Sequence, residues 1–547
     1  MTTSRLGLCL LLGLCAFGWS RLDRAHEIDD VAFYSIASSS AITSFTIPDS
    51  DPNKRTILVV TNADSSSPLS LRVSELPSPK VNSTPTRLRL LAPSTVVATQ
   101  RIESTKPDAK PTPSEQRQFH VHTGQGPFDD QRFYHTVTAG LLHFDEQLSV
   151  YAHPGAVQLS DFQLESLAAK FSQARESVSQ LLSAAARDID GDGRFCVLLV
   201  PSGYQAEQPK AYVRPADFSA SISDQRSNQA DMLYLTTPLP LDSEIESLIA
   251  HELTHAVRCS LRPDLAESDW VHEGLAHCVE VAASESTRNI NHRIARFLEH
   301  PERYPVIVYD YQRSGLFREH GCRGATFLFM DSVARLSGHD QFCAKVAQSG
   351  LTGVPNIESA SDAKLAALFR NWTGGLAKQL HPEEPPTVRG GFVCVGPRTI
   401  GWDGPSLEIE VRPTATAFID VSDRRTLAIQ ATSAVQTTLV QMSVRETLPI
   451  TVEKTSRGLH AAVTCRANVT RLVVGVETTN GRRSESLAVH AVENPRSHES
   501  LTIELDDPYR QMTLKAFAQH ADGTFSATRV ELPGAERFAS GIANAGQ

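Results

Sequence analysis

The sequence H-E-L-T-H at residues 251–255 constrains the fold more than any other part of this 547-residue chain. It lies within residues 243–258, whose apolar positions repeat with the spacing of an amphipathic helix. Residues four apart share one face of a helix, so we expect the side chains of His251 and His255 to lie side by side. Two imidazoles in that arrangement can bind one zinc ion, and Glu252 then lies to one side, within reach of a water molecule at the metal.

A second helix is predicted at residues 269–280. Its apolar residues share one side, whereas Glu273, His277 and Glu280 share the opposite side. The intervening segment 259–267 is rich in polar residues and contains a proline, which permits a turn between two antiparallel helices. Such a pair of helices would place Glu273 opposite the two histidines.

These two segments together resemble the gluzincin metallopeptidases. H-E-L-T-H followed by W-x-x-E-G-L-A-H-x-x-E is specific over about residues 243–280, and it most resembles the secreted hyicolysin-type branch of that group. The resemblance implies a zincin-like metallopeptidase domain in which one catalytic zinc ion is held by His251, His255 and Glu273. It also implies that Glu252 is the general base that activates water.

Two further residues of the second predicted helix, His277 and Glu280, allow more than one interpretation. His277 could bind the metal in place of Glu273. Otherwise His277 and Glu280 are expected to orient the metal ligands through hydrogen bonds, or to form an ordinary solvated polar face. The resemblance also implies a tyrosine or histidine that donates a hydrogen bond to the oxyanion, and the candidates are Tyr309, Tyr311 and His320.

Asp188, Asp190 and Asp192 form a D-x-D-G-D-G sequence that matches the first half of a calcium-binding loop. The twelfth position of such a loop should be glutamate, but here it is Leu199. This mismatch favours a tight Asp/Gly turn over a Ca²⁺ site.

The amino-acid composition argues against some classes of binding partner. The formal net charge is -10, the pI is about 6.0, and the sequence contains no long basic run, which argues against binding to nucleic acid or to an anionic membrane. Residues 1–25 contain an apolar run typical of a signal peptide, with an uncleaved N-terminal anchor as the alternative. We therefore expect a secreted or cell-envelope protein whose partners are peptide or protein substrates.

The pattern along the chain predicts a multidomain α+β protein. A small β module is expected at residues 26–75, and a linker or pro-segment rich in Pro, Ser and Thr at 76–117. The zincin-like domain follows at 118–382, where residues 232–235 are either an edge strand that pairs with an extended substrate or an interior strand. Short strands and turn signals, such as Asn-Gly at 480–481, predict one or two β-sandwiches at 386–535.

Seven cysteines follow the signal-like segment, and export would allow them to be oxidised. Two pairings are suggested, Cys259–Cys278 between the two ligand helices and Cys394–Cys465 in the C-terminal region, although spacing alone does not determine them.

The function expected from these features is that of a secreted zinc-dependent metalloendopeptidase. Two alternatives remain open. The chain could be a catalytically inactive zincin-fold protein that binds a surface, or it could be a zinc aminopeptidase. No G-x-M-E-N-type motif occurs near residues 200–240, so the sequence lacks this recognisable acidic anchor for a free amine.

Overall fold

The computed structural model describes the chain in separate stretches. The described residues are 32–36, 42–47, 54–63, 66–76, 112–122, 130–202, 209–219, 226–239, 243–284, 288–316, 319–380, 387–389, 392–394, 396–402, 404–432, 435–443, 450–455, 458–464, 469–480, 483–493, 500–505, 511–520 and 525–532. Within them, no helix is both long and apolar enough to cross a membrane. The signal-like segment 1–25 and most of the linker 76–117 lie outside these residues, so both remain predictions.

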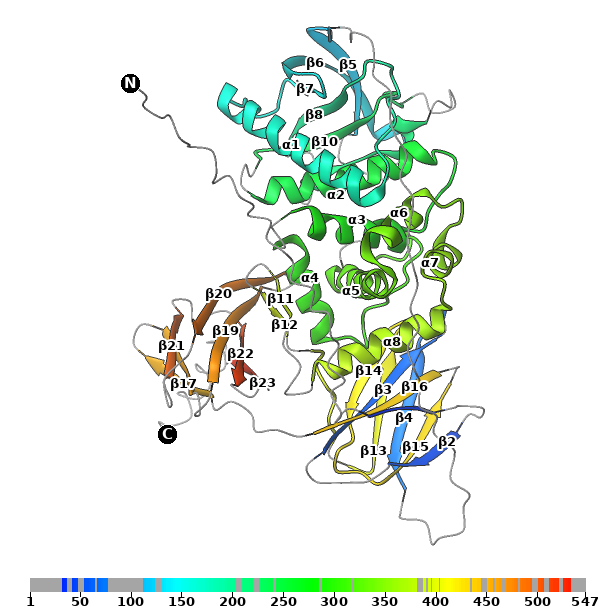
Figure 1. Cartoon of the computed structure of the whole chain (residues 1–547), viewed down its shortest axis with the longest axis vertical. Coiled ribbons are helices and arrows are strands. Elements are labelled where there is room, and N and C mark those ends of the chain that lie inside the picture. The colour runs from blue at the N-terminus through cyan, green and yellow to red at the C-terminus, as the bar shows by residue number, and fades with distance from the viewer. Residues whose placement is uncertain are drawn as a thin grey trace, which may run out of the picture.

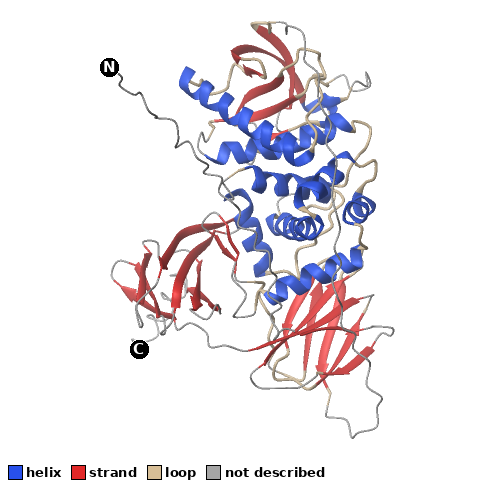
Figure 2. Ribbon diagram, in the orientation of Figure 1, coloured by secondary structure: helices blue, strands red, loops and turns tan. Residues whose placement is uncertain are grey.

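The architecture is mixed α+β, with helices α2–α8 between regions of β-sheet (Figures 1 and 2). The helices are α1 (Asp161–Leu182), α2 (Ser243–Leu261), α3 (Asp269–Ala283), α4 (Arg288–Glu299), α5 (His320–Ser337), α6 (His339–Gln348), α7 (Gly353–Ser361) and α8 (Leu365–Lys378). Two short 3-10 helices are η1 (Gln131–Phe133) and η2 (Pro215–Phe218). The predicted helix at 159–187 corresponds to α1, which begins after a capping box formed by Ser160 and Gln163.

A mixed sheet with strand order β5-β6-β7-β8-β10-β9 precedes helices α2 and α3. Its strands are β5 (Gln116–His122), β6 (Tyr134–Phe144), β7 (Leu148–Ala152), β8 (Phe195–Pro201), β9 (Ala211–Tyr212) and β10 (Met232–Thr237). Alternate residues face opposite sides, so Val197 and Leu199 pack in the core with α1 and α2, whereas Cys196 and Leu198 pack in a second core on the other face. The sheet therefore supports α2, the helix that follows β10.

Strand β10 lies inside this sheet. It pairs in parallel with β8 and antiparallel with β9, and every residue of β10 is buried. The alternative of an edge strand at residues 232–235 is therefore wrong, and the interior alternative is correct. Two residues of β9 cover the side of β10 that a substrate strand would have used.

The N-terminal strands do not form a module of their own. β1 (Ala32–Ile36) and β3 (Lys54–Asn62) pair with β14 (Thr416–Asp420) and β16 (Val435–Ser443), whereas β2 (Ile42–Thr46) and β4 (Leu69–Glu75) pair with β13 (Ser406–Val411) and β15 (Thr426–Ala431). The two four-stranded antiparallel sheets share one core, to which Leu58 and Leu71 contribute from opposite sheets. The prediction of a separate β module at 26–75 is wrong, because its strands pair with strands from beyond residue 405 and share a core with them.

This sandwich is joined to the helical region. Ile57 and Val59 of β3 face away from the sandwich core and pack in the large core that includes Trp372 of α8. Figure 1 shows α8 lying across the sheet that contains β3, β14 and β16.

The remaining C-terminal strands form further sheets. They are β11 (Thr387–Arg389), β12 (Phe392–Cys394), β17 (Ile450–Thr455), β18 (Gly458–Thr464), β19 (Val469–Asn480), β20 (Arg483–Glu493), β21 (Ser500–Leu505), β22 (Gln511–His520) and β23 (Phe525–Leu532). Their orders are β11-β12, β17-β18-β21 and β20-β19-β22-β23. The expected hairpin at 480–481 is present, since Asn480 pairs with Arg483. The predicted C-terminal β region at 386–535 is thus divided between the shared sandwich and these sheets.

The suggested disulfide between Cys259 and Cys278 is not formed. Both residues are described, both are buried, and no disulfide joins them. The two helices are held instead by apolar packing and by polar contacts at the metal centre. Cys465, half of the other suggested pair, lies outside the described residues.

Candidate metal centre

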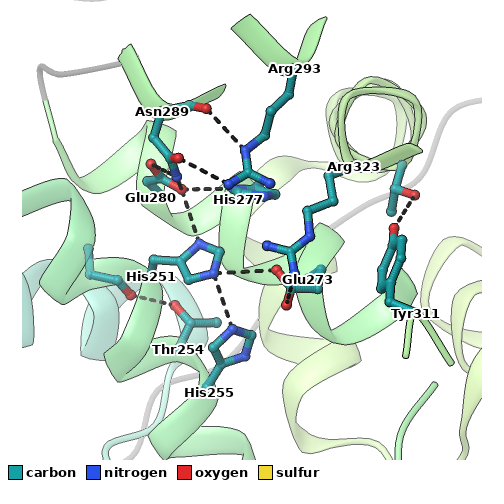
Figure 3. Close-up of polar contacts among 12 residues, drawn as sticks. His251, Thr254, His255, Glu273, His277, Glu280, Asn289, Arg293, Tyr311 and Arg323 are labelled. Atoms are coloured by element: carbon teal, nitrogen blue, oxygen red, sulfur yellow. Dashed lines mark hydrogen bonds and ion pairs between the residues drawn. The ribbon is translucent and has the colours of Figure 1, made fainter. Parts of the chain in front are cut away.

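Helix α2 carries the two histidines on one face. The apolar residues Ile245, Ile249 and Leu253 of this helix are buried, which fixes the rotation of the helix about its axis. The Nε2 atoms of His251 and His255 then lie 3.2 Å apart, as the four-residue spacing predicts. Figure 3 shows the two imidazoles one above the other, with the Nε2 atoms directed toward each other.

Helix α3 brings a carboxylate to this pair. Oε2 of Glu273 lies 3.5 Å from Nε2 of His251. One donor atom from each of His251, His255 and Glu273 lies within 4.8 Å of the other two. Oε2 of Glu273 is also buried and accepts no hydrogen bond from any described residue. A buried carboxylate oxygen left in this way beside two imidazole nitrogens fits a divalent cation, and two histidines with one carboxylate are a donor set that zinc uses.

The position of α3 depends on a close approach to α5. A Cβ atom at Gly274 would come within 2.8 Å of the Met330 side chain and 2.9 Å of the Thr326 side chain. Glycine at this position therefore lets α3 and α5 pack closely at the residue that follows Glu273.

Glu280 lies behind His251 and accepts hydrogen bonds from several side chains. Nδ1 of His251 is 3.1 Å from Oε2 of Glu280, and Nδ1 of His277 is 2.8 Å from the same oxygen. Oγ of Ser247 donates to Oε1, and Nδ2 of Asn289 donates to both carboxylate oxygens. A carboxylate that accepts from the distal nitrogen of a metal-binding histidine fixes its tautomer and its ring orientation.

His277 contacts this carboxylate and lies against His251. Its ring centroid is 4.6 Å from that of His251, and the side chain is fully buried. His277, His251 and Glu280 also form a group whose donor atoms lie within 4.8 Å of one another. His277 is grouped with His251 and Glu280, and not with His255 and Glu273, so its position matches that of a residue beside the proposed ligands.

Burial and neighbouring charges shift the ionisation of these groups. Burial raises the pKa of Glu252 to about 7, because its carboxylate is removed from water. Burial alone would also raise the pKa of Glu273, but the Arg323 guanidinium and the His251 imidazole lower it well below the usual value. Burial opposes the charged form of His251, yet Glu273 and Glu280 raise its pKa to about 10.

The three candidates for the oxyanion donor lie in different places. Tyr309 is 53% exposed, and the ring of His320 packs against that of His292, 5.0 Å away. Tyr311 is 1% exposed, and its hydroxyl lies 3.5 Å from Oγ1 of Thr326. In Figure 3 the Tyr311 ring lies beyond Glu273, on the side away from His255. None of these contacts is made to His251 or His255.

His272 lies against one of the paired histidines. Its ring centroid is 4.2 Å from that of His255, at an interplanar angle of 74°. Burial lowers the pKa of His272 to about 4, so this imidazole is neutral near pH 7.

The aspartate loop at residues 188–193 forms the tight turn that its sequence favours. The two carboxylate oxygens of Asp188 accept from the backbone amides of Gly191 and Gly193, and Asp190 pairs with Arg117 at 2.8 Å. The acidic group that the fold brings together is Asp188, Asp190 and Asp231. Asp192 is not part of it and accepts instead from the backbone of Arg194.

Sequence reasoning did not identify Arg323, Ser247 or Asn289 as residues near the metal centre. Ser247 lies four residues before His251, so helical spacing could have placed it on the same face. Asn289 and Arg323 come from α4 and α5, and no local pattern connects them to the motif.

The geometry defines a candidate divalent-metal centre with two histidines and one carboxylate, built on a helix pair. No family model matches this chain, and no curated protein matches it. The gluzincin resemblance therefore remains a prediction that rests on residues 243–280.

Proposed function

We propose that this chain is a zinc-dependent metalloendopeptidase with a zincin-like active site. The observation that supports the proposal most is the convergence of donor atoms from His251, His255 and Glu273 within 4.8 Å of one another, on a helix where the residue after His251, Glu252, is also buried. A bound zinc ion would polarise the scissile carbonyl and lower the pKa of a water molecule.

The proposed roles of this chain's own residues follow from their positions. His251, His255 and Glu273 would hold the ion, and Glu280 would hold His251 in its binding orientation. Glu252 would take a proton from the attacking water and later give it to the leaving amine, so that the elements of water are added across the peptide bond. In the metal-free protein, burial raises the pKa of Glu252 to about 7.

The proposal also includes a substrate class and a cellular location for the protein. Peptides or proteins are the proposed substrates, and the apolar segment within residues 1–25 supports an extracytoplasmic location.

The test is Glu252→Gln, which keeps the shape of the side chain and removes the base. Zinc content is measured first, and internally quenched peptides with blocked termini then report endopeptidase activity. We expect one zinc per chain in both proteins, and a loss of activity of about 10²-fold or more in the variant. Glu165→Gln, on an exposed part of α1, is the matched control and should retain full activity. Equal activity of Glu252→Gln and wild type, with equal zinc content, would refute the proposed mechanism.

A further inference from the structure

Arg323 lies in the first turn of α5 and reaches the metal centre. Its Nη2 atom is 3.2 Å from Oε1 of Glu273, and its side chain is 14% exposed. Figure 3 shows the His251 imidazole and the Arg323 guanidinium both next to the Glu273 carboxylate. A permanently charged group therefore lies in the immediate surroundings of the proposed metal ligands.

The guanidinium is supported by Tyr311. The central carbon of the Arg323 guanidinium lies 5.4 Å from the centroid of the Tyr311 ring, within the range of a cation–π contact. The backbone amide of Tyr311 donates to Oδ2 of Asp269 at 2.7 Å. Asp269 is the first residue of α3, four positions before Glu273. The support for Arg323 is thus anchored on the helix that carries the carboxylate.

This arrangement makes the two oxygens of Glu273 unequal. Oε1 is paired with Arg323, whereas Oε2 lies 3.5 Å from Nε2 of His251 and accepts no hydrogen bond from the described residues. A carboxylate can give a metal one oxygen or two. Two oxygens together with two histidine nitrogens would already supply four donors, the number that fills a tetrahedral zinc site. A catalytic site must keep one position open for water or substrate.

We propose that Arg323 is a positioning residue that restricts Glu273 to a single metal-binding oxygen and so preserves the open position. The ion pair makes it unfavourable for Oε1 to turn toward a cation, because that movement would leave a largely buried guanidinium without its carboxylate. Tyr311, proposed from the sequence as an oxyanion donor, takes part by holding this guanidinium. The inference rests on the proposed function, since it requires that Glu273 bind a metal.

Cobalt(II) provides a direct measurement. The purified full chain is freed of metal with a chelator and titrated with Co²⁺, and the visible absorption is recorded per bound ion. Azide is then added, because this anion changes the visible spectrum when it takes an open position on the ion. We expect wild type to show a strong spectral change with azide. Arg323→Met should bind one Co²⁺ and lose most of this response, because the second oxygen of Glu273 then occupies the open position.

Two further variants separate charge from shape. Arg323→Lys keeps a cation next to Oε1 and should retain most of the azide response. Arg335→Met is the matched control, because it removes a largely exposed guanidinium from the same helix, and it should respond to azide as wild type does. Arg323→Leu provides a second neutral variant if Arg323→Met does not fold, as judged by circular dichroism.

The outcomes distinguish this inference from the proposed function. Failure of wild type to bind Co²⁺ would refute the metal centre itself. If wild type and the neutral variant each bind one Co²⁺ and respond equally to azide, the metal centre stands and the role of Arg323 is refuted. A kinetic measurement adds a second criterion, because blocking the open position should reduce kcat with little change in KM, and Arg323→Lys should partly restore kcat.

Discussion

Nδ1 of His251 lies 3.1 Å from Oε2 of Glu280, while Nε2 of the same ring faces His255 and Glu273. One imidazole thus joins a buried carboxylate to the donor cluster. This is the arrangement by which proteins fix the tautomer of a metal-binding histidine and increase its basicity. A substitution at Glu280 should therefore change the metal affinity, although Glu280 is not a proposed ligand.

The first prediction concerns Glu280→Gln. The amide keeps the size of the side chain but removes the charge that stabilises His251, so zinc affinity should fall by about 10- to 100-fold. Competition with a chromophoric chelator measures this change, and Glu165→Gln on α1 is the control. An affinity equal to that of wild type would show that the contact with His251 does not support the metal.

The second prediction separates Glu273 from His277 as the third ligand. Glu273→Gln should reduce zinc binding strongly, because the unpaired Oε2 is lost from the donor cluster. His277→Gln should have the smaller effect, since His277 is not in the group that His251, His255 and Glu273 form. Zinc titration of both variants decides between the two. A greater loss in His277→Gln would assign the third ligand to His277.

The third prediction is that zinc binding releases a proton. Without metal, the pKa of His251 is raised to about 10 by Glu273 and Glu280 despite its burial, so the imidazolium form predominates at pH 8. Zinc binds the neutral imidazole, and the proton must leave. Calorimetric titration at pH 8 in two buffers with different ionisation enthalpies should give about one proton per zinc. Equal observed heats in the two buffers, before any correction for buffer ionisation, would contradict a protonated His251.

The fourth prediction uses the raised pKa of Glu252 in the metal-free protein. A carboxyl with a pKa near 4.5 when unfolded and about 7 when folded stabilises the fold fully below pH 4.5, and this contribution is lost as the pH rises through 7. Glu252→Gln avoids the buried charge. At pH 8 the metal-free variant should therefore be more stable than wild type by up to about 3 kcal/mol. Urea unfolding with a chelator present, at pH 4 and pH 8, tests whether the advantage appears only at the higher pH.

The extent to which the sequence predicts this site follows from the range of the interactions involved. His251 and His255 lie on one helix, and Glu273 lies on the next helix after a short turn, so helical periodicity was enough to bring them together. Arg323 could not be placed in this way. Its distance from Glu273 depends on how α5 packs against α3, which no local pattern encodes.

The same limit applies to the fold: elements with a local pattern were predicted, whereas pairing between distant segments was not. Helices α2 and α3 correspond to the two predicted helical segments, because each has its own apolar periodicity. The shared sandwich was missed, since β3 pairs with β14 and β16 across more than 350 residues. A strand's alternating pattern tells which face is buried but not which partner covers it.

The last prediction tests the close packing that brings Arg293 and Arg323 together. A Cβ atom at Gly324 would lie 2.1 Å from the backbone oxygen of Arg293, and backbone cannot move aside as a flexible side chain can. Gly324→Ala should therefore force α4 and α5 apart and destabilise the protein by about 3 kcal/mol or more. Gly375→Ala is the matched control, because Gly375 lies within α8 and a Cβ there meets nothing within 4 Å, so it should stabilise the protein by up to about 1 kcal/mol. Urea unfolding of the two variants measures both effects.

Because Arg323 directly precedes Gly324, Gly324→Ala should also weaken zinc binding, whereas Gly375→Ala should leave it unchanged. Zinc affinity that is unaffected in a destabilised Gly324→Ala variant would show that the helix contact supports the fold without positioning the metal centre.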